Sequence, residues 1–358
     1  MSRFVRSGFS RLTVVLAVLL AFSTTALGTG LALGSGSAEA QPLPATQASA
    51  ADALPLFAFY YPSSDAAVLK QQIVLAKSAG VQGWIVSWKD TVLNDSRLKL
   101  LMQDAGQEDF KLAMIYQGLD SNRDPLPESE VAKDFQTFET RYAPSPVFYK
   151  LGGKTLTLWS GTWRYSPAQV QAVTTPVRGK LLVLGTQKSV ASYDQIARYI
   201  DGDAYYSPSV NPQVDNAYAA ELNAMATAVH GNGGYWIATF APGFDAKPVD
   251  GTGTVPRDDV QTLRAEYAAA IASSPDILSL TGWNEFSETS YLDAVAALRG
   301  ASVPVGELNQ DSSSSSGVSD SHLPDGLLLA GAAGLFVGTV GLLVALGRRR
   351  PVPPSKEH

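Results

Sequence analysis

The sequence contains no cysteine and only three histidines among its 358 residues. His322 and His358 fall in a Ser-rich segment and at the last position, so His230 is the one histidine of the central part. Zinc sites are built mainly from Cys and His, and His usually activates a Ser or Cys nucleophile. We therefore expect no metal and no cofactor, and a fold stabilised by its core rather than by disulfides.

Positive charge is scarce between the two ends of the chain. The formal net charge is -6; residues 1–40 carry +2 and residues 326–358 carry +3, which leaves -11 for the residues between them. Nucleic acids and other polyanions are bound through basic surfaces. The acidic excess therefore excludes nucleic acid as the expected partner.

The N-terminus has the pattern of an export signal. Three arginines precede an apolar run over residues 12–33, and small residues at 38–40 offer a cleavage point. This pattern predicts a signal peptide over 1–40 and a linker over 41–53. An uncleaved N-terminal anchor is the alternative, and either arrangement exports the rest of the chain.

The C-terminus has the pattern of a membrane anchor. Residues 301–326 form a Ser-rich stalk, and residues 327–346 are uncharged. At about 1.5 Å per helical residue this stretch is long enough to cross a bilayer. Three arginines follow it, which predicts a cytoplasmic tail over 347–358. We expect a single-pass protein of the cell membrane with residues 54–300 outside the cell.

Strand and helix patterns alternate through residues 54–300. The predicted strands are 56–61, 81–88, 111–117, 155–159, 181–184, 203–206, 235–240 and 277–283. The predicted helices are 66–79, 96–104, 128–142, 166–174, 193–200, 216–230, 260–273 and 292–298. Apolar strands alternating with helices are typical of a parallel (β/α)8 TIM barrel. An open doubly wound sheet is the alternative, disfavoured because no glycine-rich phosphate loop follows the first strand.

The last predicted strand runs into a polar loop that carries two carboxylates. Glu285 and Glu288 lie three positions apart, directly after Trp283 and Asn284. Loops at the ends of barrel strands hold catalytic groups, and paired carboxylates perform glycoside hydrolysis. We therefore expect Glu285 and Glu288 to act as an acid–base pair. A solvated loop with incidental charges is the alternative.

Aromatic side chains dominate the ends of the predicted strands. In sugar-binding sites such rings stack on pyranose faces, while amide side chains bind hydroxyl groups. The expected substrate-binding residues are Tyr60, Tyr61, Trp88, Tyr116, Trp159, Tyr206, Trp283, Asn284 and Tyr291. For any single ring, packing at the top of the barrel is the alternative role.

Six blocks of sequence within residues 56–293 carry a resemblance to known enzymes. They are 57–62, 76–88, 145–154, 241–245, 256–257 and 283–291, of which the last is the most specific. In these blocks the chain resembles glycoside hydrolase family 99, the endo-α-mannosidases and related enzymes. A second likeness is to the α-1,3-glucanases of glycoside hydrolase family 71. The resemblance implies a glycoside hydrolase that cleaves an α-linked polysaccharide, either α-mannan or α-1,3-glucan.

The resemblance also implies a role for each glutamate. Glu288 matches the general acid. Glu285 matches a base that acts on the sugar's own 2-hydroxyl with retention in the mannosidase-like enzymes, whereas the first carboxylate activates water with inversion in the glucanase-like ones. Ser287 replaces a histidine of the mannosidase-like motif, and Ser63 and Ser64 replace a Trp-Tyr pair. These changes lie at the expected substrate rim, so the sugar, the linkage, the stereochemistry and endo or exo action stay open.

The sequence thus predicts a membrane-anchored extracellular glycoside hydrolase. A non-catalytic glycan-binding module on the same barrel is the alternative, and a purely structural wall spacer is a third. The intact glutamate pair favours the enzyme, because binding alone does not require both carboxylates.

Overall fold

The computed structural model describes residues 54–204, 215, 217–245, 254–258, 260–283 and 292–300. All of them belong to one of the two units into which the chain divides, Ala40–His358. The predicted signal peptide, linker, stalk, membrane helix and tail lie outside the described residues. Among the helices within them, none is long and apolar enough to cross a membrane.

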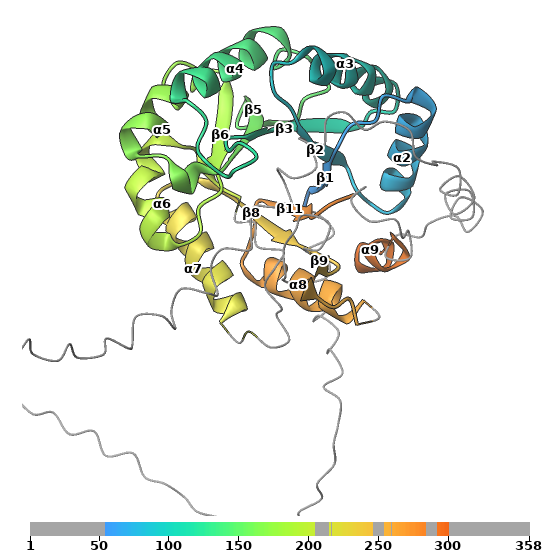
Figure 1. Ribbon diagram of the computed structural model, residues 1–358. Helices are drawn as coiled ribbons and strands as arrows, with labels where there is room; N and C mark the ends of the chain where they lie inside the picture. Colours follow the sequence, from blue (N-terminus) through green and yellow to red (C-terminus); the bar gives the residue numbers. More distant parts are fainter. Residues whose placement is uncertain are drawn as a thin grey trace, which may run out of the picture. The chain divides into compact units, whose positions relative to one another are not determined.

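Eight parallel strands close into a barrel within the described part of the chain (Figure 1). They are β1 (Leu56–Tyr60), β2 (Gly83–Ser87), β3 (Lys111–Gln117), β5 (Lys154–Ser160), β6 (Leu181–Gly185), β7 (Gly202–Asp203), β8 (Tyr235–Phe240) and β11 (Ile277–Leu280). β1 pairs with β2 and β11, and the pairing of β3 with β5 closes the ring. The predicted TIM barrel is confirmed, and the closed ring rules out the open sheet.

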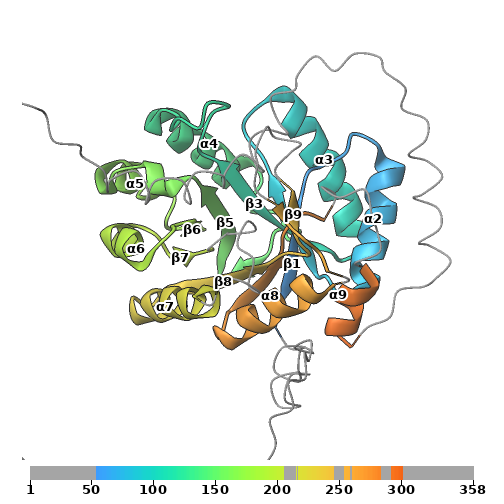
Figure 2. The same ribbon diagram turned by 60° about the horizontal axis from the view of Figure 1, so that its bottom comes forward.

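Helices surround this barrel (Figures 1 and 2). They are α2 (Ala66–Ser78), α3 (Val92–Gln107), α4 (Glu128–Arg141), α5 (Pro167–Thr174), α6 (Val190–Ile196), α7 (Tyr218–Gly231), α8 (Gln261–Ala272) and α9 (Leu292–Leu298), with short 3-10 helices η1 (Thr162–Arg164) and η2 (Ala197–Tyr199). α3 begins before the predicted residue 96 because the Thr91 side chain accepts the Asn94 N–H and caps the helix. Ser189 caps α6 in the same way, which likewise starts that helix earlier than predicted.

Two short hairpins interrupt the alternation and were not predicted. β4 (Lys150–Leu151) pairs antiparallel with β5, and β9 (Phe244–Asp245) pairs antiparallel with β10 (Thr254–Val255). Strands of two residues are too short to produce a recognisable alternation of polar and apolar residues. Tyr149, just before β4, packs edge-on against Phe57 at 5.1 Å between ring centroids, at the N-terminal end of the barrel.

Two hydrophobic cores lie on opposite faces of the strands. Successive side chains of a strand point to opposite sides, so the barrel interior receives Phe57 and Phe59 of β1, together with Ile85, Ala113, Ile115, Leu156, Leu158, Leu182, Leu184, Ala204, Ile237 and Ile277. The larger core lies between the strands and the helices. Gly83 lets Phe57 lie inside the barrel, because a Cβ at Gly83 would overlap the Phe57 ring and lie 2.5 Å from the Lys111 carbonyl oxygen.

Candidate active site

The alternation of side chains decides which strand-end residues face the mouth of the barrel. In β1, Phe57 and Phe59 point inward, so Tyr61 continues on the inward side and Tyr60 points outward. By the same rule Ser87 follows Ile85 on the inward side of β2. The two adjacent tyrosines therefore have different surroundings, although both were predicted to bind sugar.

Five of the predicted sugar-binding rings lie in the outer core; Trp283 is 6% exposed, and the other four are more deeply buried. Tyr60, Trp88, Tyr116 and Trp159 are each 0–1% exposed and pack between the strands and the helices. A ring without an exposed face has no surface on which a sugar can stack. The structure assigns these four rings to packing, which corrects their predicted role in substrate binding.

The contacts of these rings explain why the strand ends are so aromatic. Tyr60 stacks on Trp84 with 3.7 Å between centroids, and its hydroxyl donates to Gln72 Oε1 on α2 at 2.5 Å. Tyr116 and Trp159 both pack against Phe135 of α4, at 5.5 and 6.0 Å. Each ring therefore fills the space between the last residues of a strand and a neighbouring helix.

Trp283 is the last described residue before the loop that carries the predicted glutamates. Its N–H donates to the Phe59 carbonyl oxygen at 2.8 Å, and the Thr281 N–H donates to that of Phe240 at 2.9 Å. The Trp283 ring is 6% exposed and lies 6.4 Å from Trp84. The chain after β11 is thus held between the C-terminal ends of β8 and β1, up to Trp283.

Tyr61 is half-buried, and its inward direction stays compatible with the predicted contact to substrate. Five of the predicted site residues lie outside the described residues: Tyr206, Asn284, Glu285, Glu288 and Tyr291. The proposed catalytic pair therefore remains a prediction from the sequence.

Two hydroxyl side chains, one on β8 and one on β11, face the barrel interior. Thr239 and Ser279 are register partners, and their hydroxyl oxygens lie 2.8 Å apart. Both side chains are buried, and they share one side of the strands with Ile237 and Ile277. The interior is therefore polar on the side where Trp283 begins the loop.

Two buried carboxyl groups near the rim were missed by the sequence reasoning. Glu266 of α8 accepts the Ala241 N–H through Oε2 at 2.6 Å, and Asp203 of β7 accepts the Gln187 N–H through Oδ2 at 2.9 Å. Burial raises the pKa of both carboxyl groups well above its ordinary value. Each one holds a backbone amide just past the end of a strand. An isolated acid on an apolar helix face is the signal that could have identified Glu266.

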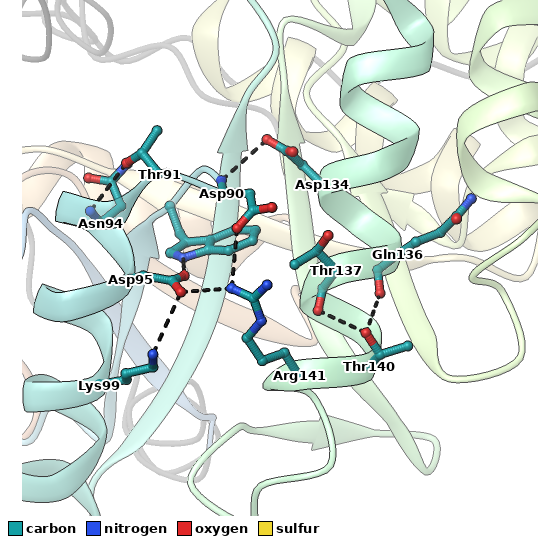
Figure 3. Close-up of polar contacts among 11 residues, drawn as sticks. Asp90, Thr91, Asn94, Asp95, Lys99, Asp134, Gln136, Thr137, Thr140 and Arg141 are labelled. Atoms are coloured by element: carbon teal, nitrogen blue, oxygen red, sulfur yellow. Dashed lines mark hydrogen bonds and ion pairs between the residues drawn. The ribbon is translucent and has the colours of Figure 1, made fainter.

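Hydrogen bonds and ion pairs between charged side chains hold the turn that follows β2 (Figure 3). Arg141 of α4 donates to Asp95 Oδ2 at 2.7 Å and to Asp90 Oδ1 at 3.2 Å. Asp95 also accepts the indole N–H of Trp88 at 3.3 Å, and Asp134 accepts the Asp90 N–H at 3.3 Å. α3, α4 and the end of β2 are therefore tied together at this rim.

Within the described ranges, no group of three or more His, Asp or Glu side chains is arranged to hold a metal ion.

Comparison with known proteins gives matches at the level of structure alone. No protein-family model matches the sequence, and no curated protein matches it. The structure is similar to the GH99 endo-α-mannosidase from Bacteroides thetaiotaomicron in complex with BIS-TRIS-propane, with a TM-score of 0.58 and 18% identity, covering 72% of this chain and 98% of that one. A second structure of a GH99 endo-α-mannosidase from Bacteroides thetaiotaomicron matches with a TM-score of 0.56 and 18% identity, covering 71% of this chain and 85% of that one.

At this level of identity the likeness concerns the fold. The barrel is similar to that of a family 99 enzyme over nearly the whole length of the first of these structures, which confirms the resemblance to family 99 at the level of fold. Neither structure supports the likeness to family 71, which stays a prediction.

Proposed function

We propose that this protein is an exported, membrane-anchored glycoside hydrolase that cleaves α-linked polysaccharide outside the cell. The observation that carries the proposal is the family 99-like barrel together with the Glu285–Glu288 pair, which follows directly on the last barrel strand. Strand-end loops at the C-terminal face carry the catalytic groups of TIM-barrel enzymes. The hydrogen bond from the Trp283 N–H to the Phe59 carbonyl oxygen supports the proposal, because it fixes the backbone two residues before Glu285.

In the proposed reaction the two glutamates have different protonation states. Glu288, as a carboxylic acid, donates its proton to the glycosidic oxygen while the bond from that oxygen to the anomeric carbon breaks. Glu285, as a carboxylate, accepts a proton from the group that attacks the anomeric carbon. This group is the sugar's own 2-hydroxyl in the retaining version of the reaction and a water molecule in the inverting version.

Product analysis tests the proposal most directly. The protein is incubated with α-mannan and with α-1,3-glucan, new reducing ends are measured, and the configuration of the first product is followed by NMR. We expect cleavage of at least one of these polymers. Binding of a polymer without any new reducing ends would instead support the non-catalytic module.

Substitution of Glu288 tests the assignment of the acid. Glu288→Gln is expected to bind the polymer as the wild type does and to lower turnover by about a hundredfold to ten-thousandfold, the usual contribution of a general acid. Glu221→Gln, on the exposed side of α7, is the matched control. Near-normal turnover of an unactivated polymer by Glu288→Gln would remove this residue from the mechanism.

A further inference from the structure

Three neighbouring loops bring positive charge to one part of the barrel rim. β3 pairs with β5, and β5 pairs with β6; β3 is teal and the other two strands are green (Figure 1). Arg123 lies in the loop after β3, Arg164 in η1 after β5, and Lys188 just after β6. The strands are parallel, so all three loops leave the barrel at its C-terminal end, where the proposed catalytic pair also begins.

The cations are close enough to influence one another. Lys188 Nζ lies 4.6 Å from the centroid of the Trp163 ring, and Arg164 Nη2 lies 3.3 Å from Asp124 Oδ1. Burial lowers the pKa of Lys188, and the charge of Arg123 lowers it further. Burial also lowers the pKa of Arg123, and the charge of Arg164 adds to this. The charge of Arg123 is therefore felt at Lys188 and that of Arg164 at Arg123; Lys188 and Arg123 are half-buried, and Arg164 is exposed.

The carboxylates of the same loops, Asp120 and Asp124, offset part of this positive charge. Asp124 is paired with Arg164, and Oδ1 of Asp120 accepts the backbone N–H groups of Asn122 and Asp124 at 2.9 and 2.8 Å. Among the described residues, no carboxylate lies within ion-pair distance of Arg123. The three cations and these two carboxylates leave a formal charge of +1 at this part of the rim, while the residues between the two ends of the chain carry -11.

The loops that carry these cations are held in place. The Tyr165 hydroxyl, next to Arg164, donates to the Leu126 carbonyl oxygen at 3.1 Å and to that of Gly118. These bonds join the loop after β3 to the loop after β5. A site whose backbone is fixed before binding loses little entropy when a ligand arrives.

We propose that Arg123, Trp163, Arg164 and Lys188 form a subsite for an oxyanion carried by the glycan: a carboxylate, sulfate or phosphate group on a sugar residue. Guanidinium groups match the geometry of such oxyanions, and the half-buried Trp163 ring offers apolar surface to a sugar. The inference rests on the proposed function in one respect, namely that the ligand is a glycan. It requires no turnover.

Binding of three polymers with one backbone tests the subsite. Dextran is the neutral α-linked probe, carboxymethyl-dextran carries carboxylates, and dextran sulfate carries sulfates. Affinities are measured by affinity electrophoresis and calorimetry for the wild type, Arg123→Gln and the double variant Arg123→Gln/Lys188→Gln. Arg198→Gln is the matched control, because Arg198 also lies 4.6 Å from an aromatic centroid, that of Tyr199, but in η2 before β7 and therefore at the opposite rim.

We expect at least one of the two anionic dextrans to bind more tightly than dextran. The double variant should lose about tenfold in affinity for that polymer, the value of one good charge-assisted contact, with no change for dextran. Arg198→Gln should bind as the wild type does, and the advantage of the anionic polymer should shrink in high salt. Melting temperatures verify that the variants fold. If the double variant does not fold, the single variant Arg123→Gln is used for the comparison of affinities.

Equal affinity of the wild type for all three polymers would refute the subsite. Equal losses of affinity for the anionic polymer in the double variant and in Arg198→Gln would also refute it. The result of the binding experiment does not depend on whether the protein cleaves any polymer. A protein that binds carboxymethyl-dextran through Arg123 and cleaves no polymer would retain the subsite while the proposed enzyme failed. A protein that cleaves neutral polymer but binds neutral and anionic dextrans equally well would support the proposed enzyme and refute the subsite.

Discussion

Replacing Glu266 by glutamine should change how the stability of the barrel depends on pH. The Glu266 side chain is 1% exposed, its Oε2 accepts the Ala241 N–H, and its Oε1 has no hydrogen-bond partner among the residues that the structure describes. Burial raises the pKa of this carboxyl well above its ordinary value. The folded protein therefore keeps a proton on Glu266 at pH values where the unfolded chain has already released it.

The direction and size of the effect follow from this difference in proton binding. Below the unfolded pKa of about 4.3, Glu266 carries its proton in both states and the fold has its full stability from this group. As the pH rises toward the folded pKa, the free energy of unfolding falls by about 1.4 kcal/mol per pH unit for this one group.

Glutamine keeps an oxygen for the Ala241 N–H but cannot ionise. Its amide N–H groups take the place of Oε1, for which the described part of the chain offers no partner, at a cost of about 1–3 kcal/mol that is the same at every pH. Glu266→Gln should therefore be less stable than the wild type at about pH 5, and this difference in the free energy of unfolding should shrink as the pH rises toward the folded pKa of Glu266.

Urea unfolding followed by tryptophan fluorescence measures this difference at several pH values. Subtracting the variant from the wild type removes the titration of all other groups. The exposed Glu221→Gln on α7 should keep the pH dependence of the wild type. Parallel curves for the wild type and Glu266→Gln across this pH range would show that Glu266 does not retain a proton in the folded state.

Three further predictions concern packing and topology. Asp95→Ala leaves the buried indole N–H of Trp88 without its acceptor and should lower the free energy of urea unfolding by about 1–3 kcal/mol, whereas Asp95→Asn should lose less. Gly83→Ala should lower the free energy of unfolding by about 1–3 kcal/mol, because the added methyl group would overlap the Phe57 ring. Gly179→Ala, with no atom within 4 Å of the added methyl group, should leave this free energy almost unchanged, and equal losses in the two variants would contradict the packing argument. A chain ending at Asp320 should be recovered soluble and folded, whereas the full-length protein should sediment with membranes; recovery of the full-length chain in the soluble fraction would refute the proposed anchor.

The strands of the barrel were predictable because parallel strands are buried on both faces. Segments such as Leu181–Gly185 and Ile277–Leu280 are almost continuously apolar, which separates them clearly from the amphipathic helices. β7 was predicted as 203–206 and is observed as Gly202–Asp203, with residues 205 and 206 outside the described part. β4, β9 and β10 are set by local hairpin pairing between segments of two residues, for which an apolar pattern carries no information.

The site was harder to predict because position at a strand end does not determine the direction of a side chain. Tyr60 and Tyr61 are consecutive, and the sequence contains no sign of which one faces inward until the register of β1 is known. A shift of one residue in that register would exchange their surroundings. The buried acids were missed for a related reason. Asp203 is an ordinary residue in the sequence and becomes unusual only through burial, and the one sequence sign for Glu266 is its place on the apolar face of its helix.

The aromatic enrichment of the strand ends has a structural purpose that still bears on the proposed active site. Tyr60 stacks on Trp84, and Trp84 lies 6.4 Å from Trp283, whose N–H is bound to the Phe59 carbonyl oxygen. These rings form a continuous buried contact from α2 to the last described residue before Glu285. Because close-packed rings have few alternative arrangements, the start of the loop is fixed by the core rather than by the loop's own polar residues. Residues without any contact to a sugar can therefore determine where the proposed catalytic pair begins.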